Sequence, residues 1–171
     1  MARAFVSVGS NVQPAANVRT ALTLLAARVH IVAVSTVYLT APLGRPEQDS
    51  YYNCVVEIET GLPPRDVKEA VLRRVEDALG RRRSADKYAP RTIDLDLIAY
   101  GDLVVNETGM HLPDPEISER PFLALPLCEL APGWRVTGSD RPIEAVAAQL
   151  DCSDMRPLPD YTRRLRQEVM P

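Results

Sequence analysis

Cysteine, histidine and aromatic residues are scarce in this sequence. Its three cysteines are widely spaced and no C-x-x-C pair occurs, so we expect neither a zinc site nor a disulfide framework. No apolar run is long enough to cross a membrane. The first residues, Met1 to Val8, are too poor in apolar side chains for a signal peptide and indicate a strand. We therefore expect a cytoplasmic protein with no membrane partner.

Several nucleotide-binding motifs are also missing. The sequence has no G-x-x-x-x-G-K-[ST] loop, no Rossmann G-x-G-x-x-G and no kinase signature set. The formal net charge of -3 over 171 residues argues against a general nucleic-acid-binding protein. Any ATP bound by this chain would have to be held by arginines, a metal ion and a cleft.

Two aspartates lie two residues apart in the apolar segment that follows Arg91. If this segment is a strand, Asp94 and Asp96 project side by side from one face. Paired carboxylates suit a hard cation such as Mg²⁺, and the arginines at 81–83 and at Arg91 suit phosphate. The alternative readings are a solvated strand edge for the acids and a helix C-terminus for the arginine run. The combined pattern favours a metal-assisted, phosphate-handling site.

The hydrophobic patterns predict the element order β-α-β-β-α-β. This order is typical of the ferredoxin-like α+β fold, an antiparallel sheet with two helices on one face. Alternation over residues 52–60 predicts a strand with one buried face and one polar face. Residues 1–150 are expected to form the domain, with C-terminal additions to the core. The charged, weakly periodic segment 151–171 is expected to be poorly ordered.

A set of short motifs occurs in a fixed order along the chain. They are Gly9-Ser10-Asn11, Thr40-Ala41-Pro42-Leu43-Gly44, Tyr51 with Asn53, Gly80-Arg81-Arg82-Arg83, Pro90-Arg91-Thr92-Ile93-Asp94-Leu95-Asp96, Arg120-Pro121-Phe122 and Pro126-Leu127-Cys128-Glu129-Leu130-Ala131-Pro132. Over roughly residues 2–150, the chain resembles the 6-hydroxymethyl-7,8-dihydropterin pyrophosphokinases of folate synthesis. The resemblance implies an enzyme that transfers pyrophosphate from ATP to the hydroxymethyl oxygen of the pterin and releases AMP.

The resemblance also implies roles for individual residues. Asp94 and Asp96 would hold two Mg²⁺ ions, and Arg81 and Arg91 would lie nearest the reacting phosphates. The residues that would bind the pterin are Thr40, Pro42, Leu43, Tyr51, Asn53 and Phe122. The residues that would bind ATP are Glu76, Arg83, Tyr88, Asp114 and Arg120. Three mobile loops are implied at residues 10–14, 44–51 and 81–92, and closure of the last over ATP would exclude water.

The sequence departs from this family pattern at four positions. Ala41 replaces a usual proline, Tyr88 replaces a usual tryptophan, and Lys87 matches an arginine of some members. Asp114 stands where histidine is common in the ATP site. An acid at this position would repel phosphates, so the sequence predicts weakened ATP binding.

Two other functions stay open at this point. A diverged protein that binds the pterin but has lost turnover would fit the change at Asp114. A nucleic-acid-binding ferredoxin-like module would use Arg81 to Arg83, although the acidic composition, the few aromatics and the aspartate pair argue against it. The favoured reading is a monomeric pyrophosphokinase whose partners are the pterin and ATP.

Overall fold

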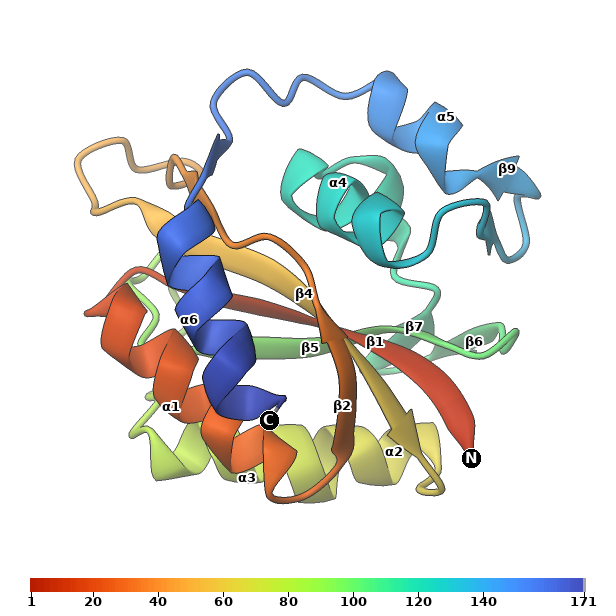
Figure 1. Ribbon diagram of the computed structural model, residues 1–171, viewed down its shortest axis with the longest axis horizontal. Coiled ribbons are helices and arrows are strands. Elements are labelled where there is room, and N and C mark those ends of the chain that lie inside the picture. Colours follow the sequence, from red (N-terminus) through yellow and green to blue (C-terminus); the bar gives the residue numbers. More distant parts are fainter. Residues whose placement is uncertain (171) are drawn as a thin grey trace.

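The apolar segment Ala2–Ser10 forms β1, the strand on which the central sheet is built. The computed structural model describes residues 1–170 and places β1 between β4 (Tyr51–Thr60) and β5 (Asp94–Tyr100), both antiparallel to it (Figure 1). The strand order is β10-β3-β4-β1-β5, and β2 also pairs with β4. The remaining strands of this sheet are β2 (His30–Val34), β3 (Tyr38–Thr40) and β10 (Arg156–Pro157). The predicted β-α-β-β-α-β order of the ferredoxin-like fold is therefore confirmed.

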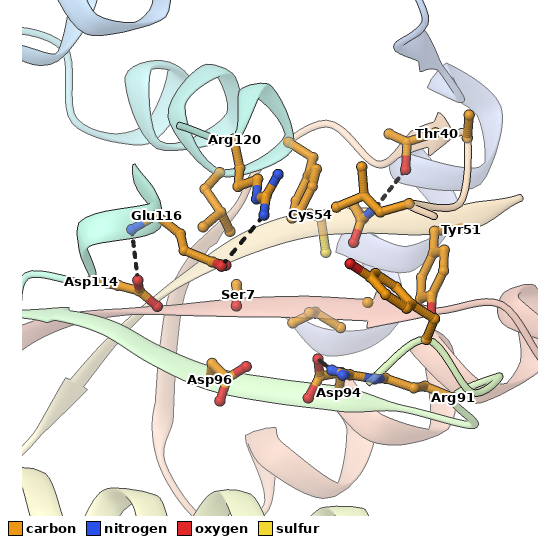
Figure 2. A pocket seen from close by; sticks show the side chains of 18 of the residues that line it. Ser7, Thr40, Tyr51, Cys54, Arg91, Asp94, Asp96, Asp114, Glu116 and Arg120 are labelled. Carbon is orange, nitrogen blue, oxygen red and sulfur yellow. Dashed lines mark hydrogen bonds and ion pairs between the residues drawn. The ribbon is translucent and has the colours of Figure 1, made fainter. Parts of the chain in front are cut away.

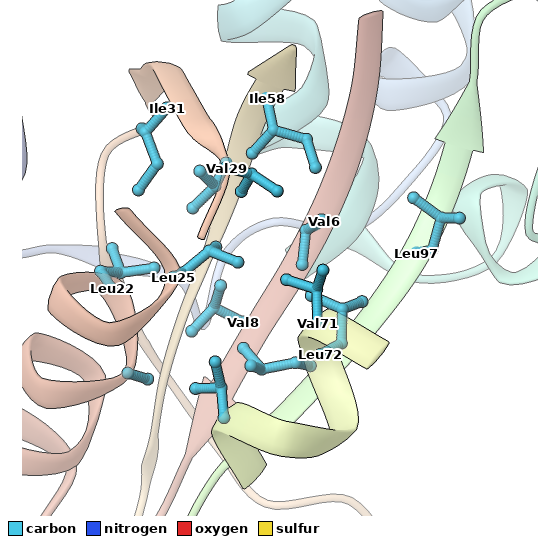
Figure 3. Packing of buried hydrophobic residues seen from close by; sticks show 14 of the residues in the cluster. Val6, Val8, Leu22, Leu25, Val29, Ile31, Ile58, Val71, Leu72 and Leu97 are labelled. Atoms are coloured by element: carbon cyan, nitrogen blue, oxygen red, sulfur yellow. The ribbon is translucent and has the colours of Figure 1, made fainter. Parts of the chain in front are cut away.

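One face of the sheet packs against helix α1 (Pro14–Ala26) and a second helical segment that begins at Pro64. This segment consists of α2 (Pro64–Asp66), the π-helical η1 (Val67–Leu72) and α3 (Arg73–Ala78). Leu22 and Leu25 of α1 lie at helical spacing and meet the β1 side chains of Val6 and Val8 (Figure 3). Each fully buried leucine or valine stabilises the fold by about 2 kcal/mol. These contacts fix β1 against the helices on this face of the sheet.

The other face of the sheet is covered by segments that follow β5. Its helices are η2 (Pro115–Ser118), α4 (Pro121–Leu130) and α5 (Ile143–Ala148). The same part of the chain forms two short hairpins, β6 (Val105–Glu107) with β7 (Met110–Leu112) and β8 (Arg135–Val136) with β9 (Arg141–Pro142). Phe5, Val55 and Ile98 of the sheet pack against Ile117 and Leu127 of this layer. The sheet therefore has a hydrophobic core on each face.

The prediction that β4 buries only one face was wrong. Val55 lies on the opposite face from Cys54 and is fully buried, and Glu57 is only 8% exposed. Glu57 is tolerated there because Arg3 donates to both of its oxygens, at 2.6 and 3.0 Å. Because a paired, buried glutamate has the sequence signature of a surface residue, the second buried face was not predicted.

The expectation of a poorly ordered tail was wrong for residues 159–169. Helix α6 (Pro159–Val169) buries Thr162, Leu165 and Val169 against α1 and β2. These residues recur at i, i+3 and i+7, which places them on one face of the helix. The helices of residues 1–170, α6 included, are too short or too polar to span a membrane.

Candidate active site

A cavity of about 230 Å³ lies between the sheet and the start of the second layer (Figure 2). Its floor is formed by residues of β1, β4 and β5, and one wall is formed by residues 114–123. The loops between β3 and β4 and between α3 and β5 supply the remaining walls. Segments far apart in the sequence thus converge on one site.

Asp94 and Asp96 both project from β5 into this cavity, as the strand pattern predicts. In the ladder between β1 and β5, Gly9 pairs with Asp94 and Ser7 pairs with Asp96. Glycine and serine are small, so the central strand leaves space in front of both carboxylates.

The two aspartates have different electrostatic environments. Asp94 Oδ1 accepts from Arg81 Nη1 at 2.7 Å, and Asp94 Oδ2 accepts from Arg91 Nη1. Burial, together with the charges of Asp94 and Glu76, raises the pKa of Asp96 to about 7. Asp94 is thus paired with two arginines, whereas Asp96 is held toward its neutral form, and a cation bound here would favour its charged form.

Two carboxylates are a plausible protein contribution to a Mg²⁺ site. No group of three or more histidine, cysteine, aspartate or glutamate side chains within residues 1–170 is arranged to hold a metal ion. Mg²⁺, however, commonly binds through one or two carboxylates and takes its other ligands from water and substrate phosphates. Asp94 and Asp96 fit this second kind of site.

Glu76 lies behind β5 and does not line the cavity. Its side chain is 3% exposed, and burial raises its pKa. The carboxylate accepts from the Leu95 backbone N–H at 2.9 Å, from Arg81 and from Arg83 at 3.2 Å. Since Arg81 Nη1 also donates to Asp94, this guanidinium connects Glu76 to β5, the strand that carries Asp94 and Asp96. Glu76 therefore orients Arg81 in this structure rather than facing the cavity.

The remaining residues expected to bind ATP are divided between the cavity and its surroundings. Asp114, Arg120 and Tyr88 line the cavity, whereas Arg83 lies outside it and is 60% exposed. Asp114 accepts from the Glu116 backbone N–H at 2.9 Å, and burial raises the pKa of its carboxyl. Arg120 approaches Glu116 at 3.7 Å, and its buried Nε has no hydrogen-bond partner within residues 1–170.

Most of the residues expected to bind the pterin also line the cavity. Those that line it are Thr40, Leu43, Tyr51, Asn53 and Phe122, whereas Pro42 does not. Asn53 Nδ2 donates to Thr40 Oγ1 at 2.7 Å, which fixes the orientation of the amide. A Cβ atom at Gly9 would lie 2.7 Å from Asn53 Oδ1, so a larger residue at position 9 would displace this amide. Glycine at that position is therefore required by the close approach of β4.

The three loops around the cavity contact one another. Arg45 Nη2 lies 2.5 Å from Asp86 Oδ2, and Gln48 Nε2 donates to the Tyr88 carbonyl at 2.7 Å. Asn11 exchanges two hydrogen bonds with the Arg91 backbone, at 2.8 and 3.1 Å. The loops at 10–14, 44–51 and 81–92 thus form one connected rim.

Several cavity residues were not identified from the sequence. They are Ser7, Val8, Gln48, Cys54, Glu116 and Leu123. Ser7 could be found only by knowing that β1 and β5 are neighbours and in which register they pair. Gln48 and Glu116 lie in loop or 3₁₀ segments, where no periodic pattern indicates which way a side chain points.

Comparisons with known proteins give a consistent result. Residues 5–132 match the family described as 7,8-dihydro-6-hydroxymethylpterin-pyrophosphokinase (HPPK). The 2-amino-4-hydroxy-6-hydroxymethyldihydropteridine pyrophosphokinase of Synechocystis sp. is 34% identical over 158 residues, which is 91% of this chain and 80% of the relative. The protein of the same description from Methylorubrum extorquens is 39% identical over 156 residues, 90% of this chain and 96% of the relative.

The fold is also similar to solved structures. A crystal structure of Plasmodium falciparum HPPK-DHPS with SDX-DHP superposes with a TM-score of 0.66 at 10% sequence identity. The alignment covers 92% of this chain and 47% of the Plasmodium chain. At this identity the similarity supports the fold, and this chain spans about half the length of that protein.

Proposed function

The chain belongs to the 7,8-dihydro-6-hydroxymethylpterin-pyrophosphokinase family, and we propose that it transfers the pyrophosphoryl group of ATP to 6-hydroxymethyl-7,8-dihydropterin. The products are AMP and the pterin diphosphate, an intermediate of folate biosynthesis. The observation that carries this proposal is the set of side chains that line one cavity. Asp94 and Asp96 of β5 line it together with Tyr51, Asn53 and Phe122, which we call the pterin end.

In the reaction, the pterin hydroxymethyl oxygen attacks the β-phosphorus of ATP and loses its proton. The bond between the β-phosphorus and the oxygen bridging it to the α-phosphorus breaks, and AMP leaves with that oxygen. Mg²⁺ held by Asp94 and Asp96 would neutralise phosphate charge in this step. Arg91 lines the cavity, and Arg81, which does not, donates to Asp94 beside it, so both charges are fixed near the carboxylates that would hold the metal and phosphates.

At the pterin end, aromatic and amide groups suit a flat heterocycle with polar edges. Tyr51 and Phe122 offer ring faces for stacking. Asn53, oriented by Thr40, has an acceptor and a further N–H with which to recognise a ring edge. Leu43 adds apolar contact at the rim.

The rim loops have a role in excluding water. A nucleotide activated for transfer is also exposed to hydrolysis, so a closed site favours the pterin as acceptor. The contacts of Arg45 with Asp86 and of Gln48 with Tyr88 support closure of these loops over the cavity. Action as a monomer stays a prediction. The cytoplasmic location stays a prediction.

The alternative functions are less well supported. A nucleic-acid-binding surface would need free arginines, but Arg81 and Arg83 are both paired with Glu76.

Analysis of the reaction products distinguishes an enzyme from a protein that binds the pterin without turnover. Purified protein is incubated with ATP, Mg²⁺ and hydroxymethyldihydropterin, and nucleotides are separated by chromatography. Pterin-dependent AMP formation supports the proposal, whereas pterin binding without AMP would favour the non-catalytic alternative.

A further inference from the structure

The C-terminal helix α6 has no role in the site described so far. The residues that match the family end at 132, and the cavity residues end at Leu123. Helix α6 lies beside α1 and β2, on the face of the sheet opposite α4 (Figure 1). It therefore cannot touch a ligand in the cavity, yet it contacts the backs of the two strands that carry the pterin residues.

The first contact is made by a buried hydroxyl. Thr162 is 3% exposed, and its Oγ1 accepts from the Val37 backbone N–H at 2.9 Å. The same hydroxyl donates to the Leu158 carbonyl at 2.8 Å, and the Leu158 N–H donates to the Val37 carbonyl at 2.9 Å. Both backbone groups of Val37 are thus bound by the start of α6.

The fixed segment continues directly into the pterin end of the cavity. After Val37, β3 pairs with β10, with Tyr38 opposite Pro157 and Leu39 opposite Arg156. The next residue is Thr40, whose Oγ1 accepts the hydrogen bond that orients the Asn53 amide. Strand β3 thus lies between β4, where Thr40 pairs with Tyr51, and residues 156–162, which hold its other edge and the residue before it.

The second contact reaches β4. The rings of Tyr161 and Tyr52 meet edge to face, with centroids 5.2 Å apart and planes inclined by 74°. Tyr52 lies between Tyr51 and Asn53 and points to the opposite face of the strand. Tyr161 is itself anchored, since its hydroxyl donates to the Ala15 carbonyl in the first turn of α1 at 2.7 Å. Tyr161 thus supports β4 directly beneath the two residues that face the pterin.

We propose that Thr162 and Tyr161 are positioning residues for pterin binding, acting through Thr40 and Asn53. The inference rests on the proposed function of the cavity. Without the Thr162 hydroxyl, the buried Val37 N–H has no partner, and the segment leading to Thr40 is free to shift. A displacement of a recognition group by a fraction of an ångström weakens binding of the pterin, whereas Asp94, Asp96, Asp114 and Arg120 lie on other segments than those bound by Thr162 and Tyr161.

The test compares variants of the full chain by pterin titration and by steady-state kinetics. Thr162→Val keeps the shape of the side chain and removes the hydroxyl. We expect the KM and Kd for the pterin to rise about tenfold, while kcat and the KM for ATP change less than about twofold. Thr162→Ser, which restores the hydroxyl, should restore pterin affinity. Tyr161→Leu is an independent variant. We expect it also to raise the KM and Kd for the pterin while leaving kcat and the KM for ATP nearly unchanged.

Val169→Ala is the matched control, because Val169 is buried at the far end of the same helix. It should lower the melting temperature and leave the pterin KM unchanged. Thr162→Val with wild-type pterin affinity would overturn the inference. Equal effects of Thr162→Val and Val169→Ala on all kinetic constants would also overturn it, since α6 would then act through stability alone. If the wild type does not bind the pterin, the proposed function fails and this inference fails with it.

Discussion

Arg81 donates from Nη1 to Asp94 Oδ1 at 2.7 Å. The same nitrogen also binds the buried carboxylate of Glu76, so a single guanidinium connects α3 to the strand that carries the aspartate pair. Because Arg81 is only 14% exposed, this arrangement is screened from solvent and geometrically fixed. The acids and the arginines proposed to bind phosphate are therefore organised before any ligand arrives.

Arg81 and Arg83 provide the first prediction, because they have the same chemistry and different placement. Arg81→Ala should lower kcat at least about a hundredfold, since a buried, fixed charge beside the phosphates is lost. Arg83→Ala should change kcat less than about fivefold, because its side chain is 60% exposed and screened. Steady-state kinetics test this, with circular dichroism as the check on folding. Similar losses of kcat in Arg81→Ala and Arg83→Ala would contradict a special role for Arg81 beside Asp94.

Asp114 provides a prediction about ATP affinity. Asp114→Asn removes a negative charge from the cavity wall and keeps an oxygen that can accept from the Glu116 N–H. We expect the Kd for Mg-ATP to fall about fivefold, which corresponds to about 1 kcal/mol of removed repulsion. Glu119→Gln is the control, because it removes the same charge from an exposed residue that lies outside the cavity. Calorimetric titration measures both, and unchanged affinity in Asp114→Asn would mean that the carboxylate does not face the phosphates.

The contact between the rim loops provides a third prediction. Gly44 has φ +72°, and a Cβ atom there would lie 2.9 Å from the Tyr88 ring. Gly44→Ala should therefore destabilise the fold by about 1 kcal/mol and also push Tyr88 away, raising the KM of both substrates several-fold. Gly109→Ala is the matched control, because Gly109 has φ +79° and nothing within 4 Å of its Cβ position. Gly109→Ala should lose similar stability but keep the wild-type KM values. Equal KM values in Gly44→Ala and Gly109→Ala would contradict a role for the contact between Gly44 and Tyr88 in substrate binding.

The raised pKa of Asp96 predicts a pH-dependent stability of the metal-free protein. Between about pH 4 and pH 7 the folded state binds more protons at Asp96 than the unfolded state, so stability falls as pH rises through this window. Asp96→Asn is neutral throughout, so between pH 4 and pH 8 it should lose about 4 kcal/mol less stability than the wild type. Urea denaturation in EDTA measures this difference. A wild type that gains stability relative to Asp96→Asn from pH 4 to pH 8 would have the opposite sign to this prediction.

The sequence predicted the strand of the aspartates well because the signal was local. Alternation around Asp94 and Asp96 requires only the period of a strand, and the structure places both side chains on one face. The order of elements followed in the same way from hydrophobic periodicity, and with it the ferredoxin-like fold.

The features that were missed depend on contacts between distant segments. Glu57 is buried because Arg3 pairs with it across two strands, and Glu76 is buried because Arg81 and Leu95 satisfy its oxygens. The buried residues of α6 lie on one face of the helix, but the surface of α1 and β2 on which this face docks is built by distant segments. No local pattern in the sequence contains this information.

Asp96 and its neighbour Asp94 are proposed to form the metal and phosphate site of a pyrophosphokinase. The most direct measurement is Mg²⁺- and pterin-dependent AMP formation by Asp96→Asn, compared with Asp102→Asn. Asp102 is exposed just beyond the end of β5 and outside the cavity, so it controls for loss of one acidic charge near the strand. We predict that Asp96→Asn loses at least about a hundredfold in kcat and that Asp102→Asn changes less than about twofold. An Asp96→Asn protein that forms AMP at the wild-type rate would contradict the account.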